Sequence, residues 1–122
     1  MFEHLKGIDE KLYNRYLTVE RNVKAASNSF YDAYLDMLEE FIKIVVERNA
    51  FVFNGTCGQI LMRQDFKDYF IKELCVDEFT FNKMRDYTRK VNQHKHSGEK
   101  KIMPDTIVTY LKIFHSATDA YA

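Results

Sequence analysis

Four polar residues near position 90 have the types and the spacing that phosphate chemistry requires. Arg85, Arg89, Asn92 and His96 follow one another at intervals of four, three and four, so they fall on one stripe of a helix. Arginine stays charged and binds phosphate through a planar fork of donors. Histidine titrates near neutral pH and therefore suits a general base. Such a stripe could cleave RNA, because RNA carries its own nucleophile in the 2′-hydroxyl.

Each residue of this stripe has an expected role in that reaction. His96 would take the proton from the 2′-hydroxyl, and Arg89 would hold the phosphate. Asn92 precedes His96 by one helical turn and could bond the imidazole and fix its orientation. The chemistry needs neither a metal ion nor a cofactor.

His94 is the alternative base. It points to the opposite side of the helix from Arg85 if the helix continues through His96, and His96 is then the histidine that shares a face with Arg89. A helix that ends earlier would make His94 the working residue instead. A metal site at the two histidines is disfavoured, because positions i and i+2 do not share a helix face.

The charge distribution adds RNA as a candidate partner. Residues 82–101 contain seven Lys and Arg and two acidic residues, a net charge of +5, while the rest of the neutral chain sums to −5. Arg85, Lys90 and Lys95 are therefore candidate phosphate-binding residues. The alternative interpretation is a solvated helix end, where cations favour the negative end of the helix dipole.

Other catalytic classes lack their signatures. The sequence contains no phosphate-binding Gly loop, no Gly-x-Ser-x-Gly elbow and no His-Glu-x-x-His. Cys57 and Cys75 can form neither a disulfide framework nor a Cys-x-x-Cys zinc site.

The elements that must position the stripe are predicted to be helices. Apolar residues recur at helical spacing over 8–24 and from Ser27 or Asn28, both suitable N-caps, to about Arg48. The second of these helices has two apolar stripes, which indicates a central helix or one that also packs on a partner subunit. From that surface we predict a homodimer.

The remaining chain also favours helices. Asn54-Gly55 marks a break after a short apolar run, 51–53, that fits a strand fragment or a buried connector. Gln59–Leu74 is helical but interrupted in register. Asp77 caps a helix to about Lys95, which ends at Ser97-Gly98, and Pro104 opens the last helix.

These patterns predict one all-α domain over 1–122, an up-and-down bundle of four main helices plus a short one. The chain has 122 residues, 46% hydrophobic and 30% charged, which excludes intrinsic disorder. No apolar run approaches the ~18 residues of a membrane helix, and the N-terminus is not a signal peptide. We therefore expect a cytoplasmic protein with no membrane partner. The chain stops directly after a helix, so a module of a longer protein is also an expectation.

At Arg89, Asn92 and His96 the sequence resembles the HEPN superfamily (higher eukaryotes and prokaryotes nucleotide-binding domain). Catalytic HEPN members carry an Arg, four to six variable residues and a His, and the form Arg-x-x-Asn-x-x-x-His is similar to one group that is often fused to restriction or helicase modules. The segment 26–30, which leads into a long helix with Leu38-Glu39, is similar to the central helix of the family. The resemblance implies a HEPN-like helical bundle.

Two functions follow from this resemblance. The first is a metal-independent endoribonuclease of a toxin or phage-defence system, with a cognate antitoxin or a fused nuclease or helicase module as partner. The second is a non-catalytic HEPN-like module that dimerises or binds nucleotide or RNA for another enzyme. Lys90 bears on this choice, because active members often have a small polar residue after the Arg.

Overall fold

The computed structural model describes residues 2–24, 30–49, 55–97 and 104–122; for 92–97 and 104–107 it describes the backbone and not the side chains. These residues form seven α-helices and one π-helical turn and no strand, which confirms the predicted all-α class. In chain order the elements are α1 (His4–Ile8), α2 (Glu10–Lys24), α3 (Phe30–Arg48), α4 (Cys57–Leu61), α5 (Gln64–Asp68), η1 (Tyr69–Glu73), α6 (Glu78–Ser97) and α7 (Pro104–Tyr121).

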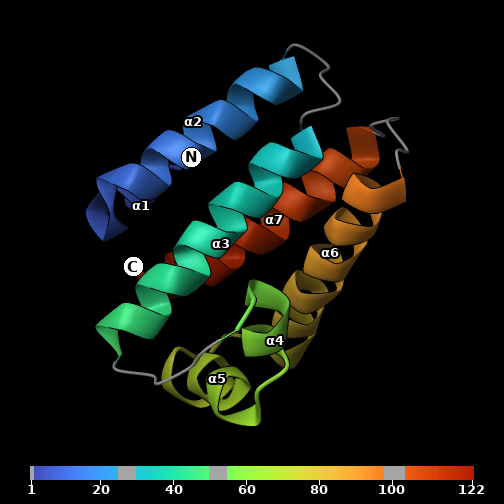
Figure 1. The fold of residues 1–122 in the computed structure, drawn as a ribbon. Helices are drawn as coiled ribbons and strands as arrows, with labels where there is room; N and C mark the ends of the chain where they lie inside the picture. The colour runs from blue at the N-terminus through green and yellow to red at the C-terminus, as the bar shows by residue number, and fades with distance from the viewer. Residues whose placement is uncertain (1, 25–29, 50–54, 98–103) are drawn as a thin grey trace.

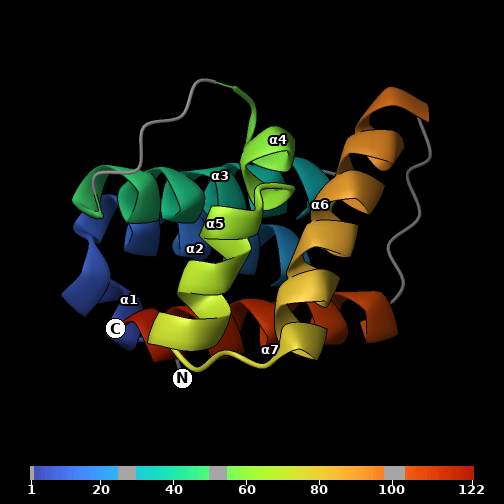
Figure 2. The same ribbon diagram turned by 90° about the horizontal axis from the view of Figure 1, so that it is seen from below.

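The four long helices alternate in direction. Figure 1 shows α2 antiparallel to α3, while α7 runs along another side of α3 and α6 rises beside them. Figure 2 shows that α6 crosses α7 at a steep angle and that α4 and α5 lie against the same side of the bundle as α6.

The centre of the bundle is α3, because its apolar residues other than the half-buried Val46 are covered within one chain. At most 5% of each residue is exposed at Phe30, Tyr31, Tyr34, Leu35, Met37, Leu38, Phe41, Ile42 and Val45. The central-helix interpretation is confirmed. The homodimer was predicted from this same surface, so that reason for a dimer no longer holds, and the dimer stays a prediction.

The placement of α6 follows from its own sequence. The Asp77 carboxylate accepts a hydrogen bond from the Thr80 amide at 2.6 Å and caps the first turn, as predicted. Phe81, Met84, Tyr87 and Val91 recur at helical spacing and form an apolar stripe that is buried against the core. Burial of this stripe fixes the rotation of α6 about its axis and turns the opposite face outward.

The N-terminal segment differs from the prediction of one helix over 8–24. The chain forms the short α1, breaks at Asp9 and starts again as α2. Asp9 has extended backbone, and its carboxylate accepts hydrogen bonds from the amides of Lys11 and Leu12 at 2.9 and 3.2 Å. A local carboxylate cap thus starts α2 two residues late, and α1 packs on α7 through His4 and Thr118.

The middle of the chain is interrupted, as its register indicates. A turn at Met62 and Arg63 separates α4 from α5, and α5 continues into the π-helical turn. The predictions for Ser27, Asn28, the run 51–53 and Gly98 fall outside the described residues. Pro104 opens α7, as predicted.

No helix within the described parts of the chain is long and apolar enough to cross a membrane.

Candidate functional site

The outer face of α6 carries the described part of the predicted stripe. Arg89 and Lys90 are exposed, and Arg85 is half-buried at the border of the packed face. The Arg89 side chain is 71% exposed. The three cations therefore lie on the solvent side of a helix whose other side is fixed in the core.

Neighbours on α6 itself hold the two arginines in this structure. The Arg89 guanidinium donates to the Asp86 carboxylate at 3.2 Å, and the Arg85 guanidinium donates to the side-chain oxygen of Asn82 at 3.1 Å. The ion pair of Arg89 points back along the helix, away from His96. An exposed pair of this kind contributes little to stability, so a phosphate can displace Asp86 at small cost.

An aromatic stack anchors the middle of α6. Tyr87 stacks on Tyr110 of α7 with ring centroids 4.1 Å apart, and the hydroxyl of Tyr34 on α3 donates to the Tyr110 carbonyl. Burial, and then the nearby Asp86 carboxylate, raise the pKa of Tyr87, so its phenol stays neutral. The Lys90 ammonium lies 6.0 Å from the centre of the Tyr87 ring, at the limit of a cation–π contact. The stack therefore joins the part of α6 that carries Arg89 and Lys90 to α3 and α7.

The helical backbone of α6 continues through Ser97. This is the condition under which the sequence assigns the shared face to Arg89 and His96 and turns His94 away. The side chains of Asn92, His94, Lys95 and His96 lie outside the described residues, so their roles stay predictions.

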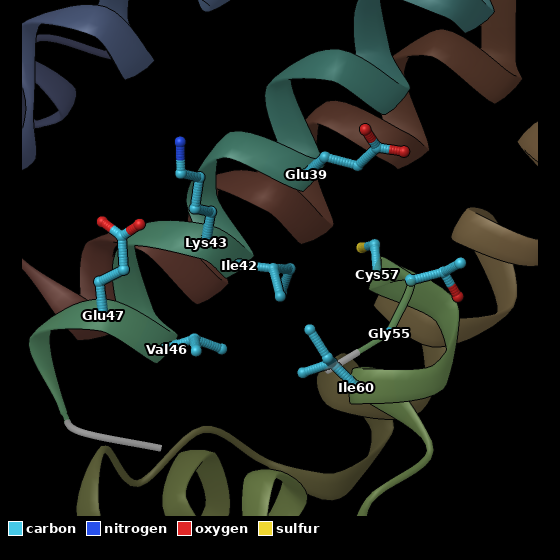
Figure 3. Close-up of a pocket in the computed structure, with 9 residues that line it drawn as sticks. Glu39, Ile42, Lys43, Val46, Glu47, Gly55, Cys57 and Ile60 are labelled. Carbon is cyan, nitrogen blue, oxygen red and sulfur yellow. The ribbon is translucent and has the colours of Figure 1, made fainter. Parts of the chain in front are cut away.

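A groove that the sequence did not indicate lies elsewhere in the fold, between α3 and α4 (Figure 3). Of the candidate residues whose side chains the structure describes, Arg85, Arg89 and Lys90, none lines this groove. Within the part of the chain that the structure describes, no group of three His, Cys, Asp or Glu side chains is placed to hold a metal ion.

Comparison of the chain with protein-family models, with curated proteins and with solved structures found no match. The resemblance to HEPN domains therefore stays a prediction that depends on the motif and on the order of the helices.

Proposed function

We propose that this chain binds RNA through the outer face of α6 and cleaves it without a metal ion. The observation that supports this proposal is the position of Arg89, whose side chain is 71% exposed on a helix that continues two turns further, through His96. An Arg89 side chain buried by packing would have favoured a structural role for this residue. Its exposure leaves it open to a phosphate group.

The reaction requires a base and a phosphate clamp. His96 takes the proton from the 2′-hydroxyl, the 2′-oxygen attacks the adjacent phosphorus, and the bond from phosphorus to the 5′-oxygen breaks. The 5′-oxygen takes a proton from water as it leaves. Arg89 stabilises the charge that develops on the phosphate oxygens. Asn92 orients the imidazole of His96. The product ends carry a 2′,3′-cyclic phosphate, and DNA is spared because it lacks the internal nucleophile.

The proposal includes a homodimer in which the second copy packs near α6. A second copy packed near α6 would supply the walls of a cleft and bring two Arg89–His96 pairs together. A role in toxin or phage-defence systems, with an antitoxin or a fused nuclease or helicase module as partner, follows from the HEPN resemblance alone.

The second candidate function is a non-catalytic module that binds RNA or nucleotide. The ion pair between Arg89 and Asp86 favours it, because a clamp poised for catalysis would be directed towards the base instead of back along the helix.

RNA binding tests the property that both candidates share. We expect the affinity for RNA to fall steeply as salt rises, because neutralised phosphates release counterions. The double variant Arg85→Ala/Arg89→Ala should bind all sequences more weakly and reduce the slope of log K against log[salt] by ~2, as measured by fluorescence anisotropy.

The matched control is Arg15→Ala/Arg21→Ala, which removes two exposed arginines from α2, a helix separated from α6 by α3. Its salt dependence should equal that of the wild type. An equal loss in both double variants, or wild-type binding that does not change with salt, would show that the α6 face is only a solvated helix surface.

A further inference from the structure

The groove between α3 and α4 has an apolar lining and a volume of about 560 Å³. Ile42 and Val46 lie one turn apart on α3 and face Cys57 and Ile60 of α4 across the opening (Figure 3). Val46, Cys57 and Ile60 are half-buried, so this lining is partly accessible to solvent. A volume of this size lies within the range of binding sites for small or elongated ligands.

The α4 wall of the groove is preformed. A reciprocal capping box starts α4: the Thr56 hydroxyl accepts from the Gln59 amide, and the Gln59 side-chain oxygen accepts from the Thr56 amide. Gly55 has a φ of +143°, and a Cβ there would collide with the Gln59 side-chain oxygen. Leu61 is fully buried and holds α4 on the bundle. The groove therefore does not depend on a ligand for its shape.

Cys57 contributes an apolar wall and not a nucleophile. Burial, and then the charge of Glu39, raise the pKa of its thiol to about 12, so the thiolate is scarce at neutral pH. A covalent ligand is therefore disfavoured, and non-covalent contact is left.

The rim of the groove on the α3 side is acidic. Exposed charged residues recur along one outer face of α3 at intervals of four, three, four and four: Asp32, Asp36, Glu39, Lys43 and Glu47. Of these, Glu39, Lys43 and Glu47 border the groove with a net charge of −1, and the whole face carries −3. In Figure 3 the charged ends of Glu39, Lys43 and Glu47 point away from the lining. The α4 rim carries no charge over Gly55–Ile60. An occupant thus meets apolar side chains on one side and carboxylates on the other.

This charge pattern selects the occupant. RNA is repelled by the acidic rim. Two exposed apolar side chains of a second copy fit poorly: Phe79 lies beside Asp77 and Glu78, and Met62 lies beside Arg63, which is paired with Asp65. The basic α6 of a second copy has its apolar face buried. A molecule that fits the groove therefore needs an apolar face bordered by cations that are not already paired.

We infer that the α3–α4 groove binds a basic amphipathic segment of another protein. Apolar side chains of the segment pack on Ile42, Val46 and Ile60, and its Lys or Arg side chains lie against the carboxylates of α3. The rim from Glu39 to Glu47 spans nine residues, about 12 Å along the helix from the first to the last, which corresponds to about two turns of a bound helix. This site is separate from the proposed RNA-binding face.

The test uses a fluorescein-labelled peptide of Leu and Lys in amphipathic helical order, and the same peptide with Glu in place of Lys. Wild-type protein should bind the Lys peptide with an affinity that falls as salt rises, and should not bind the Glu peptide. Ile60→Arg should weaken binding ~10-fold or more, because it places a cation in the lining. Glu47→Lys should weaken it roughly fivefold through the rim charge.

The matched controls are Val108→Arg and Asp119→Lys, which make comparable changes at exposed positions of α7 and should bind like the wild type. Glu47 is exposed, so its variant keeps the test valid if Ile60→Arg does not fold. All folded variants should bind RNA like the wild type, which separates this test from that of the proposed function. Equal binding of both peptides, equal losses in the α7 controls, or a wild-type dimer that Ile60→Arg dissociates would overturn the inference.

Discussion

Replacing His96 with alanine is expected to lower the rate of RNA cleavage by ~10²–10⁴-fold, the usual loss when a general base is removed. The structure continues α6 through Ser97, and seven residues at 3.6 per turn place His96 about 20° from Arg89 around the helix axis. The two residues are about 10 Å apart along that axis, a separation that the long arginine side chain and a phosphate can bridge. Single-turnover cleavage of a labelled RNA measures the loss.

His94→Ala is the matched control, because it removes the same side chain about 140° from Arg89. It should cost far less than His96→Ala, and both variants should keep the thermal stability of the wild type. The reverse ranking would assign the base to His94. Equal, small losses in both variants would leave no base on this helix.

Replacing Phe41 with alanine is expected to destabilise the fold by about 3–5 kcal/mol. Phe41 is fully buried, and its ring lies within 5.6–6.1 Å of the rings of Phe70, Phe114 and Tyr121. The substitution therefore opens a cavity where α3, η1 and α7 meet. Denaturant unfolding followed by circular dichroism measures the change.

Phe79→Ala is the control for this prediction. Phe79 is 65% exposed at the start of α6, so the same truncation removes little packing. The free energy of unfolding should change by no more than about 0.5 kcal/mol. Comparable losses at Phe41 and Phe79 would contradict the position of Phe41 at the centre of the core.

Helical periodicity predicts which face of a helix is buried but not what covers it. Phe81, Met84, Tyr87 and Val91 have the spacing of one helix face and are buried, because one face of α6 must be removed from water whatever the partner is. For α3 the same reasoning indicated a wide apolar surface but did not show which element or subunit packs on it. The structure covers that surface with helices of the same chain, a result that depends on tertiary packing.

The helix cap at Asp9 and the packing of α3 against α4 were harder to predict from the sequence. Asp9 lies within a continuous apolar period, so nothing in the spacing signals the break that its carboxylate makes between α1 and α2. The groove joins Ile42 and Val46 to Cys57 and Ile60, which are more than ten positions apart in the sequence. The sequence contains no motif for this groove, because the helix packing alone creates it. The cations of α6 were found because charge and spacing are local properties.

The most direct test of the proposed function is RNA cleavage by the wild-type protein in the presence of a chelator. We expect RNA to be cut to fragments that end in a 2′,3′-cyclic phosphate, with DNA of the same sequence left intact, because the nucleophile and the base are both present without a metal ion. RNA that remains intact while it is bound by the protein would contradict the nuclease and favour the non-catalytic module. Cleavage that starts only when a divalent cation is added would contradict the assigned roles of Arg89 and His96.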